Sequence, residues 1–291
     1  MIKQNYEIRR MTSVEEVRFA TNLAGKMNWN PGLHDPECFF AADPKGFFIG
    51  FLNGRPISCI SAVKYSDSYG FIGLYIVKPE HQRQHYGTQI GTEALKYVDG
   101  LDVGLDGVVE MVEEYAKYDF KLAYYNSRYE GQAMGATMKI SDPRIIELSR
   151  IHFSDLVTYD NDLFPASRPE FLKSWINQPH SIALGILEKD RIAGYAVLRK
   201  CLLGYKVGPL FADNEDLAES LLKALSSRIR KGTKIFLDVP GEIENPAATA
   251  IAKRHGMTVI FQTARMYRLS RAGKIKLPLE RWFGITSFEL G

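Results

Sequence analysis

The sequence has few cysteines, little net charge and no long apolar run, and each shortage excludes a class of protein. Cys38, Cys59 and Cys201 are its three cysteines, an odd number without CxxC spacing. This pattern indicates neither a disulfide framework nor a metal site, and we expect a reducing, cytoplasmic location. The 37 basic and 34 acidic side chains leave a charge of +3, too mild for a nucleic-acid-binding face. Because there is neither a membrane-length apolar run nor an apolar leader, we expect no membrane partner.

What the sequence does contain is an alternation of strand-like and helix-like segments. The content of 45% hydrophobic and 24% charged residues is close to the average of globular proteins. Asn53-Gly54 is typical of a tight turn between two strands, so a meander is expected around it. Predicted strands are Tyr6–Arg10, Phe47–Leu52, Ile57–Tyr65, Tyr69–Val77, Leu101–Val109 and Leu122–Tyr129. Predicted helices run from Thr12 or Ser13 to Gly25, and over Asp35–Ala42, Thr88–Val98 and Glu110–Tyr118.

The second half of the chain repeats features of the first half in the same order. Matching pairs recur at spacings of about 130–140 residues, which indicates two copies of one fold. The alternative is a chance similarity of two α/β domains. We expect one domain over 1–140 and a second over 150–291, with a linker near Ser141-Asp142-Pro143. The matches are Asn53–Ile57 with Lys189–Ala193, Gly73 with Gly208, Ala94-Leu95 with Ala224-Leu225, Leu105-Asp106 with Leu237-Asp238, and Arg128 with Arg265.

The segment Tyr75–Leu95 carries the chemistry that the sequence reveals. It consists of a strand, a turn stopped by Pro79, a polar loop and a helix start. Backbone N–H groups at a helix start have no intrahelical partner, and the helix dipole adds partial positive charge there, so the segment can bind phosphate. Arg83 adds a full charge, and Gly87 permits close backbone approach. The alternative is an ordinary crossover whose polar loop is only solvated.

This segment resembles the acyl-CoA signature of the GNAT acyltransferase superfamily. Val77, Pro79-Glu80, Gln82 and Gly87 fall on the signature, whereas His85 stands where a glycine is usual. Tyr115–Phe120 resembles the superfamily's Tyr-Glu-Lys-Leu-Gly-Phe helix end, and the second half resembles the C-terminal domain of YitH-like tandem GNAT proteins. The resemblance implies an α/β fold with an α+β mixed sheet. It implies two tandem GNAT-like domains, each a mostly antiparallel meander with helices around a splayed central strand pair.

The function implied by this resemblance is N-acetyl transfer from acetyl-CoA to the amine of a small-molecule or amino-acid-like acceptor. The alternative is a non-catalytic acyl-CoA-binding regulatory module. Acetyl-CoA is then the cosubstrate and no metal is implied. The oligomeric state stays open. The residues implied to bind acetyl-CoA are Tyr75, Ile76, Val77, Gln82, Arg83, Gln84, His85, Tyr86, Gly87 and Thr88.

Tyr115 stands where the superfamily often keeps a general acid. A tyrosine hydroxyl suits reprotonation of a leaving thiolate, although Tyr115 could also be one more aromatic residue on an apolar helix face. For the general base, Glu110 is the candidate, because it follows a predicted strand that could end at the cleft. A chain of water molecules could do the same work.

The second half lacks a phosphate loop. Asp213, Glu215, Asp216 and Glu219 surround its corresponding helix start and would repel a diphosphate, so we expect acetyl-CoA only in the first half. Asp160 is a candidate for recognising the acceptor amine, and Trp29 is a candidate for lining the entrance through which the acceptor comes. The alternatives are a helix cap for Asp160 and core packing for Trp29.

Overall fold

The computed structural model describes residues 5–137, 142–270 and 275–291, so the first position of the predicted linker lies outside the described residues. The helix at Asp35–Ala42 and the strands at Tyr6–Arg10, Phe47–Leu52 and Tyr69–Val77 have the predicted bounds. The helices are α1 Val14–Lys26, α2 Asp35–Ala42, α3 Tyr86–Tyr97, α4 Val112–Ala116, α5 Phe153–Asn161, α6 Pro169–Ile176, α7 Glu215–Ser227 and α8 Pro246–Arg254. The strands are β1 Tyr6–Arg10, β2 Phe47–Leu52, β3 Arg55–Lys64, β4 Tyr69–Val77, β5 Asp102–Val108, β6 Lys121–Gln132, β7 Ile145–Glu147, β8 Ile182–Glu188, β9 Arg191–Lys200, β10 Tyr205–Ala212, β11 Lys234–Pro240, β12 Thr258–Arg268 and β13 Trp282–Gly284.

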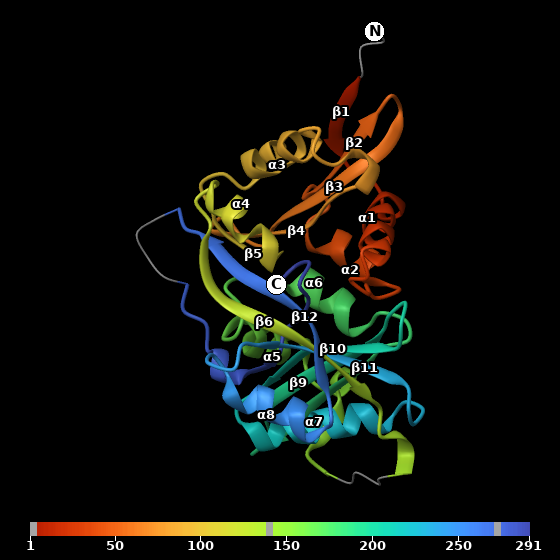
Figure 1. The fold of residues 1–291 in the computed structure, drawn as a ribbon. Helices are drawn as coiled ribbons and strands as arrows, with labels where there is room; N and C mark the ends of the chain where they lie inside the picture. The colour runs from red at the N-terminus through yellow and green to blue at the C-terminus, as the bar shows by residue number, and fades with distance from the viewer. Residues whose placement is uncertain (1–4, 138–141, 271–274) are drawn as a thin grey trace.

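Within the described residues, one mixed sheet runs through the whole molecule in the order β1-β2-β3-β4-β5-β12-β6-β11-β10-β9-β8-β7. Only β4 with β5 and β10 with β11 pair in parallel among these strands. Helices α1–α4 lie around the first half of the sheet and α5–α8 around the second, and the C-terminus lies between the halves (Figure 1). The predicted fold class, an α/β arrangement with a mixed sheet, is confirmed. No helix in the described part of the chain could cross a membrane.

The two halves exchange their last long strands. β12, from the second half, pairs with β5 of the first half, and β6, from the first half, pairs with β11 of the second. The exchanged strands also pair with each other, so they form the continuous middle of the sheet in Figure 1. Each hydrophobic core therefore contains side chains from both halves. Ala264 and Met266 of β12 lie in the core of the first half, and Tyr129 of β6 lies in the core of the second.

Both parallel strand pairs open at corresponding places. The pairing of β4 with β5 ends at Ile72, although β4 continues to Val77. The pairing of β10 with β11 ends at Val207, although β10 continues to Ala212. In each half a glycine, Gly73 or Gly208, comes directly after the last paired residue. The structure thus contains the same opened strand pair twice.

Candidate functional site

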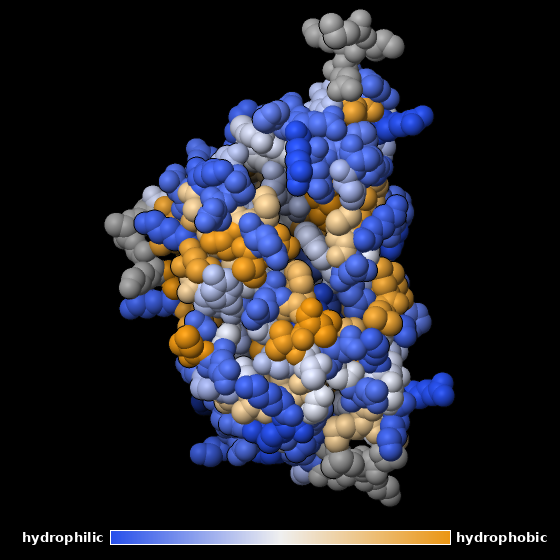
Figure 2. All heavy atoms as spheres, viewed as in Figure 1, coloured by the Kyte–Doolittle hydropathy of each residue, from blue (hydrophilic) through white to orange (hydrophobic). Residues whose placement is uncertain are grey.

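A cavity of about 830 Å³ lies where β4 leaves β5. Its walls come from β4, the loop before α3, the first turns of α3, β5, α4, β12 and the C-terminal tail. Apolar side chains gather around α4 on the face shown in Figure 2, and Val109 and Met111 are among the exposed ones. Because β12 and the C-terminal tail form part of its wall, the cavity brings the sequence motif of the first half together with residues of the second half.

The loop before α3 is held in a turn that presents the helix start to the cavity. Gln82 donates from its side-chain Nε2 to the carbonyl oxygen of Val77 at 3.0 Å, which ties the loop to the end of β4. Arg83 and His85 take left-handed conformations with φ of 60° and 64°. His85 is the N-cap of α3 but makes no side-chain hydrogen bond to the helix. The N–H groups of Gly87 and Thr88 in the first turn of α3 have no partner within the helix and can receive an anion.

Gly87 is required by a close contact with the side chain of Tyr75. A Cβ atom at Gly87 would lie 2.9 Å from the Tyr75 hydroxyl oxygen. The glycine therefore brings the first turn of α3 against β4. It keeps the cavity narrow where the two elements meet.

A β-bulge in β4 marks the point where the strand pair opens. Leu74 and Tyr75 together stand opposite Ile60 of β3, because the register shifts between the pairs Ser61–Gly73 and Cys59–Ile76. Leu74 has φ of 48°, an uncommon value for a residue with a branched side chain. Bulges redirect backbone groups and occur often beside active sites. Here the redirected residues line the cavity.

Tyr115 lies in the cavity wall, on α4, with its ring against β5. A Cβ atom at Gly107 would approach this ring to 2.3 Å, so the glycine makes room for it. Burial raises the pKa of Tyr115 to about 12, which keeps the hydroxyl protonated at neutral pH. The hydroxyl makes no hydrogen bond to another described residue. It is therefore an available proton donor.

Most of the other predicted site residues also gather at this cavity. Tyr75, Val77, Gln82, Arg83, His85, Gly87, Thr88 and Trp29 line it. Ile76, Gln84 and Tyr86 do not line it, although they belong to the same segment. The ring of Tyr86 instead packs against Tyr6, with centroids 4.6 Å apart.

Glu110 and Asp160 lie outside the cavity lining. Glu110 is exposed in the short 3-10 turn before α4. Asp160 is 1% exposed and forms a bidentate ion pair with Arg168, with both N–O distances 2.8 Å. It also accepts a hydrogen bond from the Tyr195 hydroxyl. Its carboxylate is thus fully engaged inside the second half. Among the described residues, no group of three or more metal-ligating side chains comes together.

The sequence did not point to Glu289, which reaches the cavity from the C-terminal tail. Glu289 is 3% exposed, and its Oε2 atom has no hydrogen-bond partner in the described structure. Phe288 beside it also lines the cavity. The one available signal was a single acidic residue in the otherwise uncharged ending FGITSFELG.

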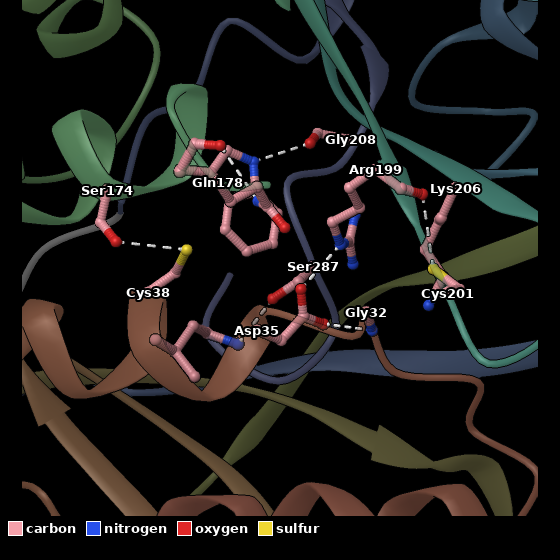
Figure 3. Close-up of polar contacts among 12 residues, drawn as sticks. Gly32, Asp35, Cys38, Ser174, Gln178, Arg199, Cys201, Lys206, Gly208 and Ser287 are labelled. Atoms are coloured by element: carbon pink, nitrogen blue, oxygen red, sulfur yellow. Dashed lines mark hydrogen bonds and ion pairs between the residues drawn. The ribbon is translucent and has the colours of Figure 1, made fainter. Parts of the chain in front are cut away.

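A buried polar cluster joins the two halves of the chain close to Ser287 of the C-terminal tail (Figure 3). Asp35 of α2 pairs with Arg199 of β9 at 3.0 Å and accepts from the backbone N–H of Gly32 at 2.7 Å. The indole of Trp175 donates to the carbonyl of Gly208 at 2.8 Å. Within the tail, the N–H of Leu290 donates to the Ser287 hydroxyl at 3.1 Å. The ion pair of Asp35 with Arg199 thus joins α2 to β9, and the hydroxyl of Tyr65, which donates to the carbonyl of Leu290 at 2.9 Å, joins the first half to the tail.

The corresponding opening in the second half is filled by the chain itself. β13 pairs with β10 at Leu210 and Phe211, and the N–H of Ile285 donates to the carbonyl of Asp238 on β11 at 2.7 Å. The following helix α7 is capped by Asn214, whose side chain accepts from the N–H of Leu217. The strand end and the helix start that lie open in the first half therefore have internal partners in the second.

Comparison with known families finds the same domain type twice. A family model described as "Acetyltransferase (GNAT) family" matches residues 12–118, and one described as "Acetyltransferase (GNAT) domain" matches residues 156–279. Holothin acyltransferase of Pseudoalteromonas sp. is 29% identical over 284 residues, covering 96% of this chain and 92% of that protein. The uncharacterized N-acetyltransferase YitH of Bacillus subtilis is 24% identical, covering 78% of this chain and 80% of YitH.

Solved structures share the fold over the full length. A putative acetyltransferase from Pyrococcus horikoshii superposes with a TM-score of 0.81 at 21% identity, covering all of this chain and 98% of the other. A tandem GNAT protein from the clavulanic acid biosynthesis pathway superposes with a TM-score of 0.60 at 10% identity, covering 94% of this chain and 100% of the other. Both structures therefore share the fold of this chain over nearly its whole length.

Proposed function

We propose that this chain, a GNAT-family acyltransferase with two GNAT domains in tandem, moves an acetyl group from acetyl-CoA to the amine of a small-molecule or amino-acid-like acceptor. One observation carries the proposal. Residues of the opened strand β4, residues of the start of α3, and Tyr115 all line one cavity. The name of the relative that covers nearly the whole chain, holothin acyltransferase, supports acyl transfer as the reaction.

The residues present fit acetyl-CoA. The N–H groups at the start of α3 and the charge of Arg83 suit its diphosphate, and the unpaired end of β4 suits its amide-containing arm as an added strand. Acetyl-CoA supplies an activated thioester carbonyl. The redirected N–H group of β4 at Val77, which lines the cavity, would hold the thioester oxygen, since such a donor stabilises a developing oxyanion by about 3–4 kcal/mol.

Tyr115 would give its proton to the thiolate that leaves when the carbon–sulfur bond breaks. Its hydroxyl is protonated at neutral pH because burial raises its pKa to about 12. Because this pKa is higher than the value near 8.5 of an ordinary thiol, the transfer requires that the tyrosine be held in place beside the leaving sulfur.

Acetyl-CoA binding belongs to the first half in this proposal. In the second half β13 occupies the opened strand pair, and Arg254 pairs with Glu215 and Glu219 at the start of α7. We also place the reaction in the cytoplasm, because all three cysteines are unpaired.

The test combines acetyl-CoA calorimetry with a thiol-release assay over a panel of primary amines. Acetyl-CoA binding together with amine-dependent thiol release supports the proposal. Binding without release across the panel would instead favour a non-catalytic acyl-CoA-binding module. A protein that does not bind acetyl-CoA at millimolar concentration rejects both functions.

A further inference from the structure

We propose that Glu289, supplied by the second half of the chain, receives the proton of the acceptor amine in the catalytic cavity of the first half. This inference rests on the proposed acetyl transfer and adds to it the group that activates the nucleophile. It also assigns the C-terminal tail a direct part in the reaction.

The position of Glu289 is fixed by the backbone rather than by its own side chain. A Cβ atom at Gly73 would lie 1.9 Å from the carbonyl oxygen of Glu289, so the tail packs directly on β4 where the strand pair opens. Leu74 and Tyr75, the next residues of β4, line the same cavity as Glu289. The carboxylate therefore stands beside the strand that would hold the thioester.

The carboxylate of Glu289 is buried and has an oxygen atom without a hydrogen-bond partner. Burying such a group destabilises the protein unless a ligand supplies the missing hydrogen bond. Its Oε2 atom has no hydrogen-bond partner, and no cation of the described residues lies within ion-pair distance of it. An alkylammonium group supplies both a positive charge and N–H donors. The acceptor is thus the partner that this carboxylate lacks.

The cations around Glu289 have their ion pairs with other carboxylates, although Arg199 and Arg128 also act on Glu289 through their charge and the Nη1 and Nη2 atoms of Arg199 have no hydrogen-bond partner. Arg128 pairs with Asp238 and Arg199 pairs with Asp35. Buried Lys206 interacts electrostatically with Glu289, but its hydrogen bond goes to the carbonyl of Trp29 at 3.5 Å. Asp106, also in the cavity wall, pairs with Arg265. Tyr115 is neutral at pH 7. Glu289 is therefore the carboxylate of this cavity wall that is buried and has no ion-pair partner among the described residues.

The side walls next to Glu289 indicate the kind of acceptor. Phe261 and Phe288 line the cavity with ring centroids 6.3 Å apart, and Trp29 lies in the same wall. Aromatic walls bury apolar area, and they leave the amine as the single charged group that needs a polar partner. The geometry fits a primary amine on an apolar or aromatic body.

The proton balance of the step is simple. The ammonium of the acceptor gives one proton to Glu289, and the neutral nitrogen forms the carbon–nitrogen bond as the carbon–sulfur bond breaks. The thiolate takes the proton of Tyr115, and the second proton of the nitrogen replaces it through solvent. Glu289 then releases its proton to water, so one acetylated amine, one thiol and one proton leave.

The experiment compares acceptors that differ in basicity. Alkylamines are ionised at pH 7 and need a base before attack, whereas arylamines are already neutral. Glu289→Gln should lower kcat/KM for alkylamines by about 10²-fold or more, and for arylamines by less than about tenfold. Acetyl-CoA affinity, measured by calorimetry, should stay at the wild-type value. Glu113→Gln, the same change on an exposed glutamate of α4, is the matched control and should change neither rate.

Three other outcomes for the rates of such variants would overturn the inference. Equal losses for both amine classes would mean that Glu289 only supports the structure. Unchanged rates in Glu289→Gln, or the basicity-dependent loss in Glu110→Gln instead, would assign the base elsewhere. If Glu289→Gln does not fold, Glu289→Ala with added formate replaces it, and formate should then restore the alkylamine rate alone. A wild-type protein without acetyl-CoA binding or thiol release ends the proposed function and this inference together, whereas the other failures leave acetyl transfer standing.

Discussion

Arg128 on β6 and Asp238 on β11 stand directly opposite each other and form a buried, bidentate ion pair with N–O distances of 2.6 and 2.7 Å. Arg265 on β12 and Asp106 on β5 repeat this pair, with both N–O distances 2.6 Å. In both cases the arginine comes from one half of the chain and the aspartate from the other. Strand exchange is thus tied to two ion pairs that a separated half could not form.

Removing one partner of such a pair should be costly. Arg128→Met leaves the Asp238 carboxylate buried without its cation, and we expect a loss of about 3–5 kcal/mol in the free energy of unfolding. The double variant Arg128→Met/Asp238→Leu buries no charge and should recover most of this loss. Urea unfolding of the single and double variants measures the difference. A double variant no more stable than the single one would contradict the assigned role of the pair.

Tyr115→Phe tests the proposed proton donor. We expect kcat to fall by about 10²-fold, because the leaving thiolate loses its acid, while acetyl-CoA affinity stays unchanged. Tyr118→Phe removes a neighbouring hydroxyl that also lines the cavity, and it should retain far more turnover. Steady-state kinetics and calorimetry give both quantities. Equal effects of the two substitutions would remove Tyr115 from the mechanism.

The pH dependence of turnover follows from the same hydroxyl. Because the pKa of Tyr115 is raised to about 12, the group stays protonated as pH rises through the neutral and mildly alkaline range. We therefore expect kcat to show no alkaline decline below about pH 10. The wild-type pH profile with a saturating amine measures this. A decline centred near pH 8 would show that another group is the acid.

Gly73→Ala tests whether the tail must lie against β4. The added methyl would meet the backbone of Glu289 at 1.9 Å, so the tail must move. We expect about 1–3 kcal/mol lower stability together with a large loss of turnover. Gly208→Ala makes the matching change in the second half, where a Cβ would meet the Thr286 carbonyl oxygen at 2.5 Å. If Gly73→Ala keeps full stability and turnover, the tail is not held as described.

Alkaline pH should destabilise the fold through buried tyrosines. Burial raises the pKa of Tyr69, Tyr124 and Tyr195 well above 10, whereas the unfolded chain ionises its tyrosines near pH 10. Because the pKa of these tyrosines is higher in the folded than in the unfolded chain, their contribution to the free energy of unfolding is fully present below pH 10. This contribution is lost as the pH rises above 10, where the unfolded chain ionises first. Above pH 10, each of the three tyrosines should lower the free energy of unfolding by about 1.4 kcal/mol per pH unit. Urea unfolding between about pH 9 and pH 11 measures the slope, and a flat profile would contradict it.

The sequence predicted the local elements well because their signals are local. Asn53-Gly54 indicates a hairpin, and β2 and β3 flank it as expected. Thr88 was expected to begin a helix that starts two residues earlier, at Tyr86, since His85 adopts the left-handed conformation that ends the loop. The acyl-CoA signature likewise lies in one continuous segment, so seven of its ten predicted residues line the cavity.

The exchange of β6 and β12 could not be predicted from the sequence, and the reason is physical. Each strand contains an arginine at the matching position, Arg128 in β6 and Arg265 in β12. The sequence pattern alone does not show whether each arginine pairs with Asp106 or with Asp238. Which aspartate it meets depends on how two distant strands pair, and local periodicity carries no information on that. The predicted domain limits of 1–140 and 150–291 remain a prediction. The same limitation hid Glu289, which lies near Gly73 in space although more than 200 residues separate them in the chain.

The number of acetyl-CoA molecules bound per chain tests the difference between the two halves. The first half presents an uncapped helix start beside an open strand, whereas β13 and the Asn214 cap fill the same places in the second half. We expect calorimetry to give one molecule per chain. Arg83→Ala should weaken binding severalfold by removing a cation at the diphosphate, and Asn214→Gly, at the matching helix start, should leave the affinity unchanged while costing a few tenths of a kcal/mol of stability. A stoichiometry of two, or a loss of affinity in Asn214→Gly, would mean that the second half also binds the carrier and that β13 yields its place to it.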